Sequence, residues 1–144
     1  MDSPLRASGY PHYDAQVLLN SQPVIVTVID PATHQVQFQN ETGLKKFGDV
    51  GNAPCFQKIV GVSAPCQFCR MPESLTSDSV VSSEVALPGN QFLLVHWAKA
   101  QTTEGRTHVI ESMTDITESK STAQALQQSQ KMESNGRLAG GIAH

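Results

Sequence analysis

The sequence contains little charge, no long apolar run and only three cysteines. Asp, Glu, Lys and Arg make up 16% of the 144 residues, whereas an average soluble domain has about 25%. No apolar stretch approaches the roughly 20 residues that a membrane span requires, and the first residues lack the apolar core of a signal peptide. We therefore expect a cytoplasmic segment without membrane contact, with any membrane anchor of the complete protein outside these residues.

The sequence also lacks an excess of positive charge. Its formal net charge is −3 and its isoelectric point is about 5.9, so nothing draws it electrostatically to nucleic acid, and we expect no nucleic-acid partner. An odd, small number of cysteines excludes a disulfide framework. Hydrophobic residues still make up 39% of the chain, which is enough to build one core.

Short apolar and alternating segments predict five strands in two groups. The first group is a hairpin of residues 24–29 and 35–39, joined by the turn Asp30-Pro31-Ala32-Thr33-His34. The second group is three consecutive antiparallel strands at residues 80–87, 91–100 and 106–113. The strands of the two groups are expected to form one sheet.

Helices are predicted between and around these strands. One or two helical turns are expected near residues 13–20, and a short helix begins after Asn40 as N-cap and stops at Gly48. Residues 49–71 contain turns, one short helix and all three cysteines. Residues 115–144 predict a long helix with a thin apolar seam, so a homodimer through this helix is expected.

The order of these elements resembles the PAS fold, a small sensor domain. The segment 40–44 stands where PAS domains begin their first helix after the second strand, and Asp115-Ile116-Thr117 stands where their outgoing helix begins. Residues 65–69, Pro-Cys-Gln-Phe-Cys, resemble the Pro-Cys-x-x-Cys of one subset of PAS domains in bacterial sensor kinases. The resemblance implies an α+β fold, with a five-stranded antiparallel sheet, short helices on one side and a long C-terminal coiled-coil helix.

These features divide the chain into three parts. Residues 1–17 are expected to be a tail or cap helix, and residues 18–117 the PAS domain. Residues 118–144 are expected to be a signalling helix that runs into the start of a phosphoacceptor helix.

The last residues, 131–144, resemble the start of the histidine kinase phosphoacceptor helix. The resemblance implies that His144 receives phosphate from ATP and that a response regulator is the partner of the complete system. The family's second helix and the domain that binds ATP and Mg²⁺ are not in this sequence, so we expect that this segment is not itself an enzyme. The parent is expected to be a bacterial sensor histidine kinase, cut here at its phosphoacceptor.

The three cysteines leave three interpretations open. Cys66 and Cys69 have the Cys-x-x-Cys spacing that holds zinc or an iron–sulfur cluster, and Cys55 offers a third thiolate. The pair Cys66–Cys69 can instead form a redox disulfide, with Cys66 as the nucleophile. All three thiols can also pack as small apolar groups.

Two histidines in predicted strands are candidates for a cofactor in the PAS pocket. His96 lies in the segment Phe92–Trp97 and His108 in the last strand, and a haem would need one of them as axial ligand. The sequence has no photoactive-cysteine motif of the kind that flavin-binding relatives carry, so a light sensor is not expected.

Three functions follow from these observations. The first is a sensory module of a two-component histidine kinase, which relays a signal through a dimeric helix to His144. The second is a PAS module that binds no ligand and only mediates dimerisation or protein contacts. The third is a thiol-redox or metal switch through Cys66 and Cys69.

Overall fold

The computed structural model describes residues 11–142, with side chains described as far as residue 137. Five strands form one antiparallel sheet in the order β2-β1-β5-β4-β3. The strands are β1 (Ile25–Ile29), β2 (Val36–Gln39), β3 (Val81–Leu87), β4 (Gln91–Gln101) and β5 (Thr107–Asp115). The predicted hairpin and the predicted three consecutive strands are both confirmed, and β1 joins them by pairing with β5.

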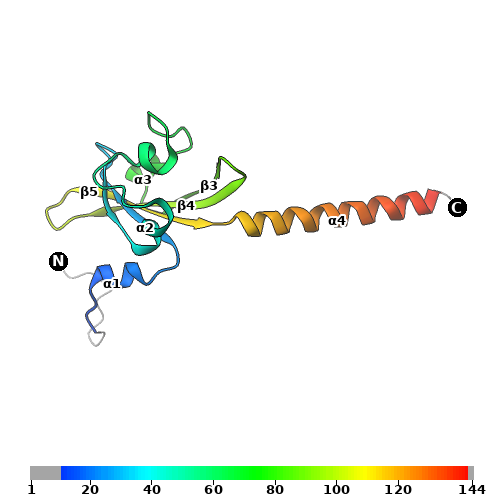
Figure 1. Cartoon of the computed structure of the whole chain (residues 1–144), viewed down its shortest axis with the longest axis horizontal. Coiled ribbons are helices and arrows are strands. Elements are labelled where there is room, and N and C mark those ends of the chain that lie inside the picture. The colour runs from blue at the N-terminus through cyan, green and yellow to red at the C-terminus, as the bar shows by residue number, and fades with distance from the viewer. Residues whose placement is uncertain (1–10, 143–144) are drawn as a thin grey trace.

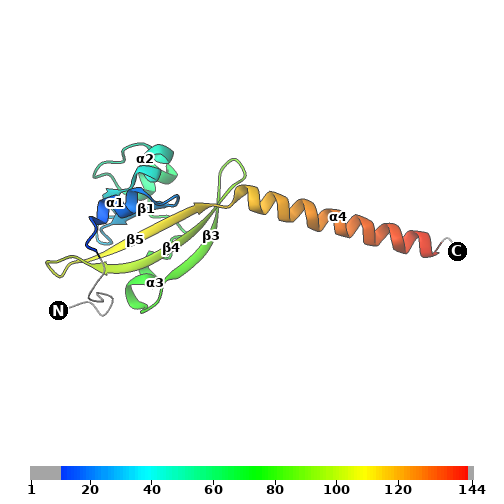
Figure 2. The ribbon, with the colours of Figure 1, turned by 90° about the horizontal axis from the view of Figure 1, so that it is seen from below.

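The helices precede, connect and follow the strands. They are α1 (Ala15–Asn20), α2 (Glu41–Phe47), the π-helical turn η1 (Phe56–Val60), α3 (Met71–Thr76) and α4 (Thr117–Ile142). Figures 1 and 2 show that α4 extends away from the sheet as one long helix. The short helix predicted within residues 49–71 is the π-helical turn, which ends at Gly61 in a left-handed conformation with φ 85°.

The core lies between one face of the sheet and the connecting segment from α2 to α3. Successive side chains of a strand point to opposite faces, and β4 shows this directly, because Leu93, Val95 and Trp97 are buried while the residues between them are half-buried. In β5, Val109 and Met113 complete the same inner face. Met71 from α3 packs against this same inner face and belongs to the same core.

Asn40 connects three elements and is fully buried. Its side-chain Oδ1 accepts hydrogen bonds from the backbone N–H of Val26 and of Gly43, both at 3.0 Å. Its Nδ2 donates to the carbonyls of Leu19 and Val24, both at 2.9 Å. The predicted N-cap is therefore confirmed, and the same amide also ties α1 and β1 to the start of α2.

Candidate functional site

A small cavity lies between the inner face of the sheet and the segment that contains η1 and the cysteines. Its volume is about 40 Å³. Strands β3, β4 and β5 supply one wall, and residues 55–69 supply the opposite wall. The lining residues are His34, Cys55, Phe56, Ile59, Val60, Cys66, Phe68, Cys69, Val85, Leu87, Leu93, Val95, Trp97, Glu111 and Met113.

The structure brings the three predicted cysteines together at this cavity. Cys55 immediately precedes η1, and Cys66 and Cys69 lie in a turn closed by the Cys69 N–H, which donates to the Cys66 carbonyl at 3.2 Å. All three are free thiols. Among the residues whose side chains are described, no group of three or more His, Cys, Asp or Glu is arranged to hold a metal ion.

Burial controls the protonation of these thiols. It raises the pKa of Cys55 to about 12, with the Glu111 carboxylate as the next largest cause. Burial is also the largest cause of the raised pKa of Cys66 and Cys69. Because the thiolate is the nucleophile, thiols held neutral at pH 7 react slowly with oxidants. This environment does not favour the redox interpretation.

Glu111 is a site residue that the sequence interpretation missed. The Trp97 indole N–H donates to Glu111 Oε2 at 2.6 Å, and the two residues are directly opposed across β4 and β5. Although the residue as a whole is half-buried, burial of its carboxyl group raises its pKa to about 7, and the Trp97 hydrogen bond opposes that shift. The signal was present in the sequence, since Glu111 alternates with Val109 and Met113 and so shares their inward face.

Neither predicted pocket histidine reaches the cavity, which corrects the expectation for both. His96 alternates with the inward-facing Val95 and Trp97, so it lies on the outer face of the sheet, where its Nδ1 is 2.5 Å from Ser82 Oγ. His108 precedes the fully buried Val109 and also faces outward. The histidine that does line the cavity is His34, from the turn between β1 and β2. Its ring meets the Phe56 ring edge-on, with the two ring centres 5.5 Å apart.

The cavity wall continues directly into the long helix. Strand β5 carries Glu111 and Met113 and ends at Asp115, and α4 begins two residues later. Thr117 fixes this junction, because its Oγ1 accepts from the Phe92 backbone N–H at 3.0 Å and its own N–H donates to Asp115 Oδ1 at 2.9 Å. The hydrogen bonds from Thr117 hold the pKa of Asp115 below its usual range. The predicted start of the outgoing helix at residues 115–117 is confirmed.

A second contact orients the first turn of α4. Lys120 Nζ lies 2.5 Å from Glu84 Oε2 on β3 and 5.3 Å from the centre of the Phe92 ring on β4. Exposed ion pairs contribute little stability, but these contacts together fix the direction in which the helix leaves the outer face of the sheet.

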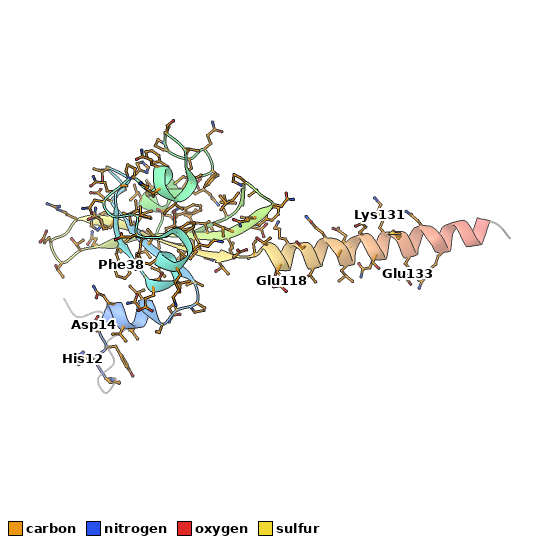
Figure 3. The ribbon with its side chains drawn as sticks, viewed as in Figure 1. His12, Asp14, Phe38, Glu118, Lys131 and Glu133 are labelled. Carbon is orange, nitrogen blue, oxygen red and sulfur yellow. The ribbon has the colours of Figure 1, made fainter. Side chains whose placement is uncertain are left out.

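Beyond this turn the described part of α4 is exposed. Figure 3 shows Glu118, Lys131 and Glu133 projecting from the helix. The apolar side chains of Leu126 and Met132 in α4 are 59% and 68% exposed, so the described part of the helix has apolar residues that this single chain does not cover. The predicted phosphoacceptor His144 lies outside the described residues. No helix in residues 11–142 is long and apolar enough to cross a membrane.

Comparison with protein families and with curated proteins found no match to this sequence. Among solved structures, an RNA-binding light-oxygen-voltage receptor superimposes with a TM-score of 0.59 at 17% identity, covering 81% of this chain and 36% of that protein. The PAS domain of nitrogen regulation protein NR(II) from Vibrio parahaemolyticus has a TM-score of 0.52 at 11% identity, covering 70% of this chain and 96% of that one. A sensory box histidine kinase/response regulator from Burkholderia thailandensis has a TM-score of 0.48 at 12% identity, covering 83% and 97%. The chain has the PAS fold.

Proposed function

We propose that this chain is the sensory module of a two-component sensor histidine kinase. An event in the cysteine-lined cavity is passed through β5 and α4 to His144, which accepts phosphate from the ATP-binding domain of the complete protein. A response regulator then receives the phosphate. The resemblance of residues 131–144 to a phosphoacceptor helix supports this assignment.

One observation carries the proposal more than any other: a single strand joins the cavity to the helix. Glu111 and Met113 line the cavity, and β5 ends at Asp115, where the Thr117 hydrogen bonds begin α4. A displacement of β5 relative to β4 therefore changes the starting position of α4. Two such helices paired in a dimer would carry that change along their length to His144.

The exposed seam of α4 supports pairing of two chains. Leu126 and Met132 are large apolar side chains exposed on the part of α4 whose side chains are described, and a helix this polar gains most of its stability from a partner. Because the seam is thin, two pairings of similar energy are available, and the sensor selects between them.

The test of the relay is the variant Thr117→Val in the complete protein. It removes the acceptor for the Phe92 N–H while keeping the shape of the side chain, at a cost of about 1 kcal/mol. Because the first turn of α4 then loses its fixed position, phosphorylation of His144 by ATP is expected to slow about fivefold. The measurement is the initial rate of phosphate incorporation, with the modified residue identified by mass spectrometry.

Thr114→Val is the matched control for this variant. Thr114 lies three residues earlier on β5, is exposed and points to the outer face. The initial rate of phosphate incorporation in Thr114→Val is expected to stay within about twofold of that of the unmodified protein, as for ordinary surface substitutions. Equal rates for both variants would contradict the relay through Thr117, and phosphate on a residue other than His144 would contradict the proposed function.

A further inference from the structure

Three residues form a row across the inner face of the sheet. Glu111 on β5 lies directly opposite Trp97 on β4 and directly opposite Thr27 on β1. Thr27 alternates with the buried Ile25 and Ile29, so its side chain shares the inner face with them. Directly opposed residues of antiparallel strands have Cβ atoms about 4.5–5.5 Å apart. The row therefore places the Glu111 carboxyl group between an indole on one side and a hydroxyl on the other.

One of the two neighbours of Glu111 is hydrogen-bonded to it and the other is not. The Trp97 indole N–H donates to Glu111 Oε2 at 2.6 Å. Thr27 is fully buried, and its Oγ1 has no hydrogen-bond partner among the described residues. A buried polar group without a partner costs free energy and is rare in folded proteins. Thr27 therefore offers Glu111 a second donor that this arrangement leaves unused.

The other titratable groups at the cavity supply no positive charge that would hold Glu111 ionised. No lysine, arginine or aspartate is among the lining residues. Besides Glu111, the titratable groups that line the cavity are Cys55, Cys66 and Cys69 from residues 55–69 and His34 from the turn between β1 and β2. Burial raises the pKa of all three thiols, so they stay neutral at pH 7.

Helix α3 adds no charge to this site either. Its Met71 packs against the core, whereas its Glu73 pairs with Arg70 at the surface, at 2.6 Å. A carboxylate in such apolar surroundings lacks a counter-ion, which disfavours its charged form. Burial accordingly raises the pKa of Glu111 to about 7.

We infer that Glu111 is a proton-operated switch, which binds Trp97 alone when neutral and both Trp97 and Thr27 when ionised. The O–H bond of the neutral carboxyl group breaks, the proton passes to water, and the carboxylate accepts a new hydrogen bond from the Thr27 hydroxyl. No group is oxidised or reduced. The new bond ties β5 to β1, and β5 leads directly into α4. The rearrangement itself is independent of the kinase assignment, whereas its role as the signal rests on the proposed function.

The experiment is a fluorescence titration of the complete chain between about pH 5 and pH 9. Trp97 is the single tryptophan and donates directly to Glu111, so its emission reports the charge of that carboxyl group. One transition with a midpoint near pH 7 is expected, and it is expected to be lost in Glu111→Gln. In Thr27→Val the carboxylate loses its second donor, so the midpoint is expected to rise by about one pH unit, a tenfold weaker acid.

His34→Asn is the control, because His34 is the histidine that lines the same cavity. The backbone of His34 has φ 61°, a conformation that asparagine also tolerates. This variant is expected to keep the midpoint of the unmodified chain. Thr27→Val removes a hydroxyl that has no partner and keeps the branched shape of the side chain, so the fold is expected to persist. Circular dichroism checks this for each variant.

Three results would overturn the switch: no transition in the unmodified chain, a transition that persists in Glu111→Gln, or an unchanged midpoint in Thr27→Val. Loss of the transition in His34→Asn would assign it to the histidine and would overturn the switch as well. The link to the kinase has its own readout, the pH profile of His144 phosphorylation in the complete protein. If Glu111→Gln kept that profile while losing the fluorescence transition, the switch would stand and its role as the signal would be contradicted.

Discussion

Replacing Asn40 by alanine is expected to destabilise the domain by about 4 kcal/mol. The Asn40 amide makes four hydrogen bonds at 2.9–3.0 Å in a fully buried position. Alanine leaves the N–H of Val26 and of Gly43 without their partner, and both lie where water does not reach them. Urea unfolding of the purified chain measures the change directly.

Asn20→Ala is the matched control for that measurement. The Asn20 Oδ1 accepts a hydrogen bond from the Glu41 N–H at 3.0 Å, but this bond lies at the surface, where water replaces the lost partner. The expected cost is below about 1 kcal/mol. If Asn40→Ala were as mild as Asn20→Ala, the amide of Asn40 would not tie α1, β1 and α2 together.

The second large effect is a loss of stability with rising pH that depends on Glu111. Its pKa is raised from 4.5 to about 7 in the folded chain, so the folded state holds a proton that the unfolded state releases between these values. The stabilisation from the proton on folded Glu111 is complete below pH 4.5, decreases as the pH rises from 4.5 to about 7, and is lost above pH 7. The decrease amounts to at most about 3 kcal/mol, since each pKa unit corresponds to 1.36 kcal/mol.

The variant Glu111→Gln isolates this effect, because glutamine stays neutral and its oxygen still accepts the Trp97 N–H. It is expected to be more stable than the unmodified chain at pH 8, by up to about 3 kcal/mol, and equally stable at pH 4.5. The three thiols stay neutral throughout this window. Glu84→Gln, on the outer face, is expected to keep the pH dependence of the unmodified chain. If Glu111→Gln also kept that pH dependence, the buried carboxyl group of Glu111 would not be its cause.

The strands were predictable because their signals are local. The β-branched run of β1, the alternation in β2 and the turns around β4 each mark a strand without reference to the rest of the chain. Asn40 was predictable as an N-cap for the same reason. Its hydrogen bonds to the carbonyls of Leu19 and Val24 were not predictable, because they depend on how α1 and the residues just before β1 pack against the start of α2.

The site was harder to predict because it depends on which face of each strand is buried. The composition of β4 does not distinguish the face of His96 from that of Trp97, and a shift of one residue exchanges them. The convergence of Cys55 with Cys66 and Cys69 depends on the path of the π-helical turn and the loop after it, which no periodic pattern describes. Glu111 was missed because a charged residue in an alternating strand is ordinarily assigned to the solvent face.

The most direct test of a cavity-driven relay compares Val95→Leu with Ala98→Val in the complete protein. Val95 lines the cavity, and leucine adds a methylene there, whereas Ala98 lies on the outer face of the same strand. If the cavity controls the position of α4, Val95→Leu is expected to change the rate of phosphorylation at His144 by about fivefold or more. The rate of Ala98→Val is expected to stay within about twofold of that of the unmodified protein. Phosphorylation rates that are unchanged in both variants, with the fold intact, would contradict a relay from the cavity to His144.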